Sequence, residues 1–565
     1  MNKFTKQCVA AVASLAMAGT LCVAGAVVAG SSAWAAPSVD TTFNTKGKTG
    51  LTTDSQDGNY QKAPWLDNAP STGSITIYKW KSETDGTTGN QLKKTPVKDA
   101  EFTIKKVKSV NSKDLDLTKY DSWVEIAKAA DGLNKNTGTV TFDDKFGTDQ
   151  KLSGSTNDNG VLRFKDLPLG LYQVQETKAP KGYSAAETRP FYMTLPMIQQ
   201  VKQETKYNYA PFVDPKNVDI SDSVQKTKDT KKTVGAGDEI SYTITADLDK
   251  VKAKDTDPNR VADEFKGYSV FDLAPANYFE SYDNVAKTVK AGSTTLTPMT
   301  DYLVSAAEAK DGKKKIEITF TDKGREALAT AANGSVGKAA KVTVDLTFKL
   351  AKTATLSTNS VTNEGGMVPS HDTGTTPSEV KTKTNPKVDF ATFQIKKVSS
   401  KDNSALPGAK FMLFANKDEA TACTNAIKEG KTSTELDKVC KAKASVGFGE
   451  KETSSEEGAD KKGLTEAYSV KRGEDFYAVE TVAPAGYIRN PDVKTINVEE
   501  KDSTKVFPVE NLPASGNDGK SWLFNLPKTG AAGVIIFALA GVCLVAVGMF
   551  IFLRNRKKEE EQQAA

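Results

Sequence analysis

Strict alternation of apolar and polar residues is the feature that most restricts the fold of this chain. It occurs in four separate runs, at 75–79, 240–244, 342–348 and 393–397, with Gly, Asn, Asp and Pro clusters between them. A period of two places apolar side chains on one face of a β-strand, so it indicates antiparallel sheets with one buried face. Helical periodicity is confined to short stretches such as 122–130 and 323–332. The sequence therefore predicts an all-β protein built as a row of β-sandwiches.

An internal repeat indicates that two of the domains share one plan. Residues 176–183, ETKAPKGY, return at 480–487 as ETVAPAGY. Each copy follows an alternating strand that ends in lysine, at Lys79 and Lys397. With roughly 150 residues per domain as a guide, a chain of 565 residues is expected to hold about three domains outside its terminal segments.

The N-terminus carries the features of a secretory signal peptide. Lys3 and Lys6 precede an apolar stretch at 9–29, and Ala33 and Ala35 form a small-x-small cleavage site. We therefore expect residues 1–35 to be removed and the mature chain to begin outside the cytoplasm.

A short motif near the C-terminus precedes a long apolar segment. The motif consists of Leu526, Pro527, Lys528, Thr529 and Gly530. The apolar run at 531–553 gives about 35 Å of helix, enough to cross a hydrocarbon core of about 30 Å. The basic residues from Arg554 onward mark its cytoplasmic end. This order resembles the cell-wall sorting signal of Gram-positive surface proteins, which implies that a sortase cysteine attacks the carbonyl between Thr529 and Gly530. A permanent single-pass anchor is the alternative.

Two cysteines remain once the terminal segments are set aside. Cys8 and Cys22 belong to the signal peptide and Cys543 to the apolar segment, which leaves Cys423 and Cys440. In an oxidising compartment a single pair predicts a disulfide, because a structural zinc site usually needs four ligands. We expect this disulfide to pin an insertion.

Composition argues against several classes of function. The formal net charge of +5 is small for this length and the charges are interspersed, so nucleic acid is not an expected partner. The single histidine, His371, provides neither a His-based catalytic group nor a His-rich metal site. No Gly-rich phosphate loop follows a strand, and we expect no cofactor, no metal and no enzymatic activity.

The repeated phrase resembles the E-box, Tyr-x-Leu-x-Glu-Thr-x-Ala-Pro-x-Gly-Tyr, of pilins that sortases assemble. The first copy keeps Tyr172 and has Val174, whereas the second has Phe476 and Ala478. The resemblance implies domains of the collagen-binding-protein B type, which are seven-stranded immunoglobulin-like sandwiches. It also implies that the chain is a backbone, or shaft, pilin.

A lysine on an inward strand position has a chemical explanation in such domains. Phe393, Ile395 and Lys397 share a parity, so Lys397 points toward the core if the other two do. Burial disfavours the charged forms of both groups, so Lys397 beside Glu480 can exist as neutral amine and neutral acid. The family resemblance implies that such a pair attacks an asparagine on the last strand, here Asn511, and forms a Lys–Asn isopeptide bond with loss of ammonia. A lysine that snorkels to a surface glutamate is the alternative.

The middle domain carries a variant of this pattern. Lys226 lies two residues after Val224 in its first strand, and Asn363 lies where family members place the acceptor asparagine. The resemblance assigns the acid to Asp272, although an Asp that opens a turn before Pro275 is the competing reading.

The first domain has the lysine and the acid, but its asparagine is ambiguous. Lys79 and Glu176 occupy the corresponding positions, whereas Asn208 and Asn217 both lie near the final strand. Because related first domains often lack the bond, the sequence leaves both asparagines open.

Residues 207–217, YNYAPFVDPKN, resemble the pilin motif Trp-x-x-x-Val-x-Val-Tyr-Pro-Lys with its following Asn. The residues that match are Val213, Pro215, Lys216 and Asn217, and those that depart are Tyr207, Pro211 and Asp214. The resemblance implies that Lys216 resolves the acyl-enzyme formed at Thr529 of another subunit, which gives a head-to-tail fibre. A chance surface lysine after a proline is the alternative.

The expected organisation has seven parts: signal peptide 1–35, N-terminal lead 36–72, N-terminal pilin domain 73–217, middle β-sandwich 218–386, C-terminal B-type domain 387–512, linker 513–525 and sorting signal 526–565. The expected partners are a pilus (class C) sortase, a housekeeping sortase, identical subunits, peptidoglycan and an accessory tip pilin. The alternative is a monomeric wall-anchored adhesin, which needs the sorting signal but not Lys216.

Overall fold

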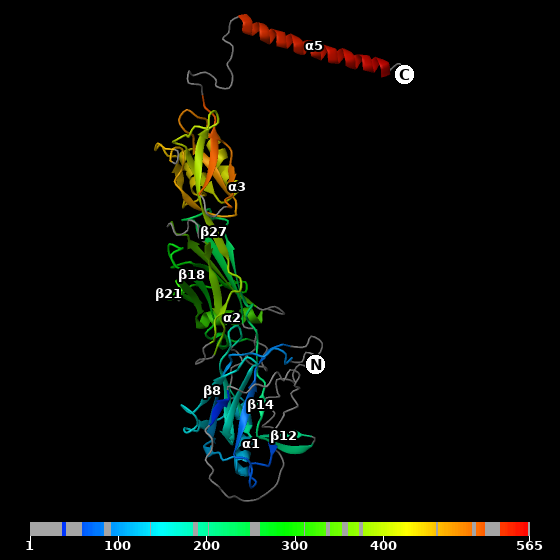
Figure 1. The fold of residues 1–565 in the computed structure, drawn as a ribbon, viewed down its shortest axis with the longest axis vertical. Coiled ribbons are helices and arrows are strands. Elements are labelled where there is room, and N and C mark those ends of the chain that lie inside the picture. The colour runs from blue at the N-terminus through cyan, green and yellow to red at the C-terminus, as the bar shows by residue number, and fades with distance from the viewer. Residues whose placement is uncertain are drawn as a thin grey trace. The chain divides into compact units, whose positions relative to one another are not determined.

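The computed structural model describes residues 37–40, 59–83, 92–135, 137–184, 190–201, 203–248, 260–309, 311–334, 340–352, 360–371, 377–458, 461–499, 504–514 and 531–562 (Figure 1). The predicted signal peptide and the motif at 526–530 lie outside these residues. The chain divides into two compact units. Unit 1 comprises Met1–Thr230, Glu239–Thr355 and Ser360–Val388, and unit 2 comprises Lys231–Asp238, Leu356–Asn359 and Asp389–Ala565. Strands predominate in both, which confirms the all-β prediction.

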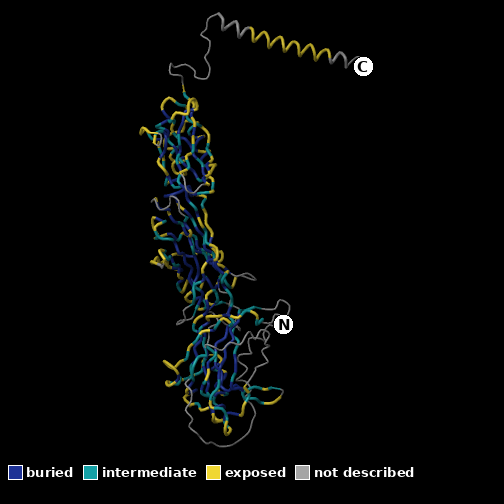
Figure 2. The backbone as a smooth tube through the Cα atoms, in the orientation of Figure 1, coloured by how far each residue is buried: buried dark blue, intermediate teal, exposed yellow. Residues whose placement is uncertain are grey.

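The N-terminal part of unit 1 is a sandwich of two sheets. The first sheet has the order β1 (Ser38–Asp40), β9 (Val161–Pro168), β3 (Thr72–Tyr78), β14 (Phe212–Val213). The second has the order β11 (Phe191–Leu195), β10 (Gly170–Lys178), β5 (Glu101–Val110), with β6 (Lys113–Asp114), β7 (Val140–Phe142) and β8 (Leu152–Ser155) also paired to β5. Alternate residues of both sheets, such as Ile75, Phe164, Phe102 and Tyr172, fill the core between them. Figure 2 shows the buried stretches of the backbone in dark blue.

A helix covers the other face of the second sheet. Helix α1 (Tyr120–Asn134) buries Trp123, Ile126, Ala130 and Leu133, whose spacing forms one apolar stripe, against a cluster that includes Leu171. It is longer than the predicted 122–130. Two small sheets complete this part: β12 (Met197–Val201), β13 (Glu204–Asn208) and β2 (Tyr60–Gln61), and the parallel pair β4 (Trp80–Lys81) and β15 (Lys216–Asn217).

The middle part of unit 1 is a second sandwich. Its first sheet has the order β16 (Val224–Asp229), β17 (Glu239–Asp247), β23 (Lys341–Lys349), β19 (Ala286–Ala291), β20 (Thr294–Thr295). Its second has the order β21 (Tyr302–Ala309), β22 (Lys313–Phe320), β18 (Ser269–Pro275), β25 (Glu364–Val368), β26 (Val380–Lys381). Strand β24 (Ser360–Thr362), the short helix η2 (Ala262–Phe265) and helix α2 (Asp322–Asn333) complete it. Alternate residues of β17 and β23 are buried, as their sequence pattern predicts.

Unit 2 contains a third sandwich with a helical insertion. Strand β27 (Lys387–Ser399) enters it and pairs antiparallel with β30 (Tyr468–Lys471) and parallel with β33 (Lys505–Asn511). The facing sheet has the order β29 (Glu450–Glu452), β28 (Lys410–Phe414), β31 (Phe476–Val482), β32 (Lys494–Ile496). Between β28 and β29 lie α3 (Lys417–Lys428), α4 (Ser433–Leu436) and η4 (Asp437–Lys441), which the sequence reading did not predict. The side chain of Asn416 caps α3 by accepting from the backbone N–H groups of Asp418 and Glu419.

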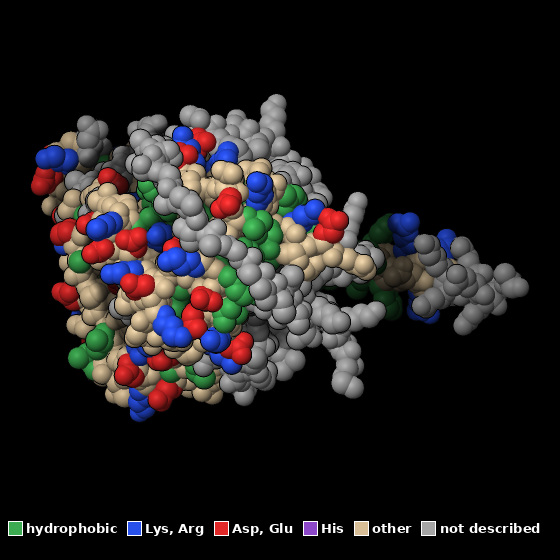
Figure 3. Space-filling model, turned by 90° about the horizontal axis from the view of Figure 1, so that it is seen from below, with side chains coloured by type: hydrophobic (Ala, Val, Ile, Leu, Met, Phe, Trp, Pro, Cys, Tyr) green, Lys and Arg blue, Asp and Glu red, His purple; other side chains and the backbone are tan. Residues whose placement is uncertain are grey.

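The C-terminal helix and the charged surface agree with the sequence reading. Helix α5 (Ala531–Gln562) contains a stretch, Leu539–Lys557, that is long and apolar enough to cross a membrane, and its described side chains are exposed. Figure 3 shows Lys and Arg interspersed with Asp and Glu over the described part of the visible face.

Candidate isopeptide sites and acceptor lysine

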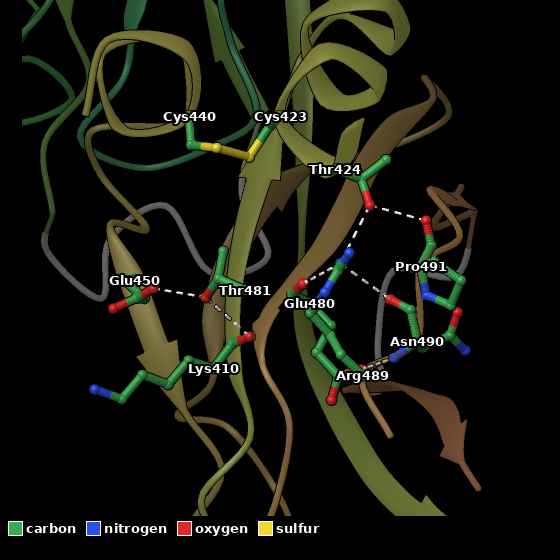
Figure 4. The surroundings of a disulfide bond; sticks show 10 residues. All are labelled: Lys410, Cys423, Thr424, Cys440, Glu450, Glu480, Thr481, Arg489, Asn490 and Pro491. Carbon is green, nitrogen blue, oxygen red and sulfur yellow. Dashed lines mark hydrogen bonds between the residues drawn. A yellow bond between two sulfur atoms is a disulfide. The ribbon is translucent and has the colours of Figure 1, made fainter. Parts of the chain in front are cut away.

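The E-box glutamate points into the core by strand parity, and a β-bulge follows it directly in both copies. In β31, Phe476, Ala478 and Glu480 have the same parity and are all buried. The register of β31 against β28 shifts directly after Glu480, so Thr481 is an extra residue, and its hydroxyl donates to the carbonyl of Lys410 at 3.2 Å (Figure 4).

The first copy repeats this bulge. In β10 the register against β5 shifts between Glu176 and Lys178, and Thr177 donates to the carbonyl of Glu101 at 3.3 Å. The bulge gives a physical role to the Glu-Thr pair of each copy. The glutamate faces the core, and the threonine hydroxyl donates a hydrogen bond to a backbone carbonyl at the bulge.

In the C-terminal sandwich Lys397, Glu480 and Asn511 meet inside the core. Lys397 Nζ donates to Asn511 Oδ1 and lies 3.4 Å from Glu480 Oε1, while Asn511 Nδ2 donates to the same Oε1 at 2.8 Å. The parallel pairing of β27 with β33, with Ser399 opposite Asn511, brings the lysine and the asparagine together. None of the three side chains is more than 2% exposed, which excludes a lysine that snorkels to the surface.

Burial shifts both ionisable groups of this site toward their neutral forms. Loss of water lowers the pKa of Lys397 to about 8, although the charge of Glu480 opposes this shift. Burial also raises the pKa of Glu480, against the opposing effects of Lys397 and of the hydrogen bonds from Asn490 and Asn511. The pair can therefore exchange one proton at small cost and present a neutral amine beside a neutral acid.

In the middle sandwich Lys226, Asp272 and Asn363 form a second buried group. Lys226 Nζ donates to Asp272 Oδ2 and, at 2.8 Å, to the carbonyl of Glu364, and Asn363 Nδ2 lies 3.4 Å from Asp272 Oδ2. A Cβ atom on Gly365 would lie 3.3 Å from the lysine Cδ, so the glycine leaves room for that side chain.

Burial again favours the neutral forms in this group. It lowers the pKa of Lys226 to about 8 and raises that of Asp272, in each case against the opposing charge of the partner. Asp272 Oδ1 and Asn363 Oδ1 are buried without a hydrogen-bond partner among the described residues.

In the first sandwich the structure brings Asn217, and not Asn208, to the acid. Lys79 Nζ donates to Glu176 Oε2 at 2.8 Å, and Asn217 Nδ2 donates to Glu176 Oε1 at 2.8 Å. All three side chains are buried. Asn208 lies in β13, where its Nδ2 faces Gln199 at 3.5 Å and its Oδ1 accepts from the N–H of Ala210. Strand β15, which pairs in parallel with β4, carries Asn217 to this position.

Lys216 lies beside Asn217 in β15 and has a different environment. Its neighbour is buried, whereas Lys216 is half-buried, as expected for adjacent residues of a strand. Within the described part of the chain its ammonium makes no ion pair or hydrogen bond. Asp214, which departs from the pilin motif, forms an ion pair with Lys93. Asp214 is therefore not the ion-pair partner of Lys216, the predicted acceptor amine.

The predicted disulfide between Cys423 and Cys440 is confirmed. It joins α3 to η4, and both cysteines are buried in a cluster with Phe414 and Val479 of the facing sheet. Figure 4 shows that the next residue, Thr424, faces a segment that the sequence reading missed, Arg489 to Pro491. Its backbone and side chains contact Glu480, and its only sequence signal is its position shortly after the E-box turn.

Two family models match this chain. The SpaA model, described as a prealbumin-like fold domain, matches residues 87–208 and 391–512, and the LPXTG cell wall anchor motif matches residues 523–560. Together with the strand-rich fold, these matches define a cell-wall-anchored surface protein with tandem prealbumin-like domains.

Fimbrial proteins are similar to the chain over nearly its whole length. It is 30% identical to fimbrial subunit type 1 of Actinomyces viscosus, over 86% of this chain and 90% of that protein. It is 25% identical to fimbrial subunit type 2 of Actinomyces naeslundii, over 88% and 92%. The full-length major pilin SpaD from Corynebacterium diphtheriae is 22% identical, with a TM-score of 0.47 over 78% of this chain and 98% of that one.

The chain belongs to the family of fimbrial subunits, the major pilins that sortases assemble into surface pili attached to the cell wall. This confirms the predicted class of protein and its location. The assignments of single residues to isopeptide bonds and to the subunit junction stay predictions.

Proposed function

We propose that this pilin is a shaft subunit that is covalently closed inside each sandwich and covalently joined to its neighbours. The observation that carries the internal part is the recurrence of one buried group, a lysine, a carboxyl and an asparagine amide, in all three sandwiches. A buried lysine beside a carboxyl and an amide is costly unless it has a specific role, because each charged group loses its hydration.

The chemistry begins with a proton transfer inside the pair. In the C-terminal sandwich the Lys397 ammonium gives a proton to Glu480, which leaves a neutral amine and a carboxylic acid. The amine attacks Cγ of Asn511, while the acid beside the amide polarises it. The new Nζ–Cγ bond forms, the Cγ–Nδ2 bond breaks, and ammonia leaves with the proton that the amine gives up. Glu480 recovers its proton, so the reaction needs no oxidant, cofactor or metal.

The middle and first sandwiches support the same proposal with different contacts. Asp272 contacts both Lys226 and Asn363 through one oxygen, and Glu176 contacts Lys79 and Asn217 through its two oxygens. We infer that Asn217 is the acceptor in the first domain, because Asn208 lies in a different hairpin. Closure would tie an early strand to the last strand in the first and C-terminal domains, and would tie β16 to the residue between β24 and β25 in the middle domain.

The junction between subunits uses the motif at 526–530 and Lys216. A pilus sortase of class C cleaves between Thr529 and Gly530 and retains the threonine carbonyl as a thioester. The Lys216 amine of a second subunit attacks that carbonyl, the Thr529–Lys216 amide forms, and the enzyme thiolate leaves. The position of Lys216 on the outward side of β15, free of ion pairs among the described residues, supports this role.

A housekeeping sortase would attach the finished fibre to peptidoglycan, and an accessory subunit would occupy its tip. The pilus would thereby support adhesion, while the shaft itself acts as a structural polymer. A monomeric wall-anchored adhesin is the competing function.

Wall extracts boiled in detergent and probed with an antibody to this chain distinguish the two functions. A covalent polymer gives a ladder of high mass, and peptide mapping of that ladder should recover Thr529 joined to Lys216. One band at the monomer mass, with no such junction peptide, would contradict the proposed polymerisation.

A further inference from the structure

The segment from Arg489 to Pro491 ties the acid of the C-terminal site to two further elements of the domain. Arg489 Nη1 donates to the carbonyl of Glu480 at 3.0 Å and to the hydroxyl of Thr424 at 3.2 Å (Figure 4). The N–H of Asn490 donates to Glu480 Oε2 at 2.6 Å, and its side chain donates to the carbonyl of Glu510 at 3.1 Å. The segment therefore contacts β31, α3 and β33, the last of which carries Asn511.

These contacts decide which oxygen of Glu480 faces the reacting amide. The N–H of Asn490 donates to Oε2 and the side-chain amide of Asn511 donates to Oε1, so each oxygen of the carboxyl has its own donor. Oε1 is therefore the oxygen that is held against Asn511. A carboxyl held in this way keeps Oε1 at the reacting amide, because rotation would break the contact of Oε2 with Asn490.

The other two sites have no equivalent contact among the described residues. Asp272 Oδ1 is buried with no partner, and the two oxygens of Glu176 are occupied by Lys79 and Asn217. The C-terminal site alone thus has a backbone donor on the far oxygen of its acid, within the described chain. The middle site can serve as an internal control in the same molecule.

We propose that Arg489 is a positioning residue for isopeptide formation in the C-terminal domain, because it holds the Asn490 N–H against Glu480. This inference rests on the proposed isopeptide chemistry. Arg489 makes no hydrogen bond with Lys397 or Asn511. It acts through the backbone, because its guanidinium donates to the carbonyls of Glu480 and Asn490. Its outer anchor is Thr424, whose hydroxyl also donates to the carbonyl of Pro491 at 2.8 Å. Thr424 follows disulfide-bonded Cys423, so that anchor is itself fixed to η4.

The test follows closure of the C-terminal and middle sites in the same ectodomain, spanning 36–525, after a short induction. Intact mass and peptide mapping give the fraction of Lys397 joined to Asn511 and of Lys226 joined to Asn363 at successive times and several pH values. In Arg489→Leu the C-terminal bond should form about tenfold to a hundredfold more slowly, as expected when a reacting group is misplaced, while the middle bond forms at the wild-type rate.

The pH dependence separates positioning from a purely structural role. Arg489 places a positive charge near Glu480, and a nearby cation favours the ionised carboxylate. Loss of Arg489 should therefore move the part of the pH–rate profile that depends on Glu480 to higher pH. Arg489→Lys keeps that charge and should restore the pH profile, with only part of the rate, because an ammonium does not match the planar contacts of the guanidinium.

Thr424→Val keeps the shape of the side chain but removes the hydroxyl, and Thr424→Ser keeps the hydroxyl. We expect slow closure in the first and wild-type closure in the second. These variants also provide the answer if Arg489→Leu fails to fold, which the loss of the melting transition of the C-terminal domain would reveal.

Wild-type rate and pH profile in Arg489→Leu, or equal rates in the two Thr424 variants, would overturn the positioning role. A wild-type protein with no link between Lys397 and Asn511 would contradict the isopeptide proposal itself, so the two failures are distinguishable.

Discussion

The first and the C-terminal domains share the E-box and its bulge, but their last strands differ. In the C-terminal domain β33 pairs with β27 without interruption, from Phe393 opposite Lys505 to Ser399 opposite Asn511. In the first domain the same parallel pairing keeps its register but is interrupted between β14 with β3 and β15 with β4, which have two residue pairs each. The break contains Asp214 and Pro215, which lie in the pilin motif.

This difference separates two tasks that the same strand position can perform. In the C-terminal domain the continuous strand holds Asn511 against the buried Lys397. In the first domain the strand resumes at Lys216 and places an asparagine inward and a lysine outward at adjacent positions. We therefore infer that the first domain interrupts regular pairing to present an amine, whereas the C-terminal domain keeps it for internal closure. The predictions below test this division, beginning with the largest effect.

Lys216→Ala should abolish the high-mass ladder and leave monomer attached to the wall, because the amine of the wall can still resolve the acyl-enzyme. Lys216→Arg should fail as well, since a guanidinium stays protonated and is a poor nucleophile. Immunoblots of wall extracts give the result. Lys206→Ala, which alters another lysine of the same domain that pairs with Glu204, is the matched control and should polymerise normally. A normal ladder from Lys216→Ala would show that the first domain does not supply the acceptor amine through Lys216, and the proposed division between the two domains would be wrong.

Glu480→Gln should prevent closure of the C-terminal domain and lower its stability by about 5 kcal/mol, the chain-entropy value for a closed loop of roughly this length. The buried lysine, left without its acid, adds to the loss. Calorimetry of the ectodomain measures the effect, and Glu457→Gln, at an exposed ion pair with Lys462, is the control. Unchanged melting of the C-terminal domain would show that its continuous strand is not covalently closed.

Reduction of the disulfide should have a smaller effect than loss of the isopeptide bond, because the Cys423 to Cys440 loop spans only 17 residues. The chain-entropy value for such a loop is about 3 kcal/mol. Thiol titration of denatured ectodomain should find two reactive thiols after reduction and none before it. Two free thiols in protein secreted by its natural host would contradict the oxidised state.

Asn511→Ala leaves Lys397 as a free amine, so the stability of the variant should change with pH more steeply than that of the wild type. The folded state lowers the pKa of Lys397 to about 8 from 10.5, so between these values the unfolded chain binds more protons. The free energy of unfolding of the variant should therefore rise as the pH increases from about 8 to 10.5. If the proposed bond is present in the wild type, the lysine nitrogen is an amide and does not titrate. Equal slopes in calorimetry at pH 8, 9 and 10 would argue that the wild-type lysine is unlinked.

Parity in the sequence was sufficient to predict the inward lysines. Lys79 follows Ile75 and Ile77, and Lys397 follows Phe393 and Ile395, and in both strands the whole set is buried. The E-box glutamates could be predicted for the same reason. Cysteine count and compartment gave the disulfide without any structure.

The choice between Asn208 and Asn217 could not be made from the sequence, because both flank the last strand and strand pairing is a long-range property. The pairing of β13 with β12 removes Asn208 from the site. Helix α3 was missed because its buried residues are small or polar, such as Ala420, Cys423 and Thr424, and give a weak apolar pattern. Arg489 and Asn490 contact backbone carbonyls, and Asn490 uses its own N–H, so their role leaves no pattern in the sequence.

The mass of the wild-type ectodomain, 36–525, tests the central claim most directly. Each closure loses one ammonia, so three bonds should lower the mass by about 51 Da, beyond the two hydrogens lost in the disulfide. Asn217→Ala should show two closures, whereas Asn208→Ala should keep three. A deficit of about 34 Da would mean that the first domain stays open and that its broken strand serves polymerisation alone. A mass that matches the unmodified sequence, apart from the disulfide, would contradict the account.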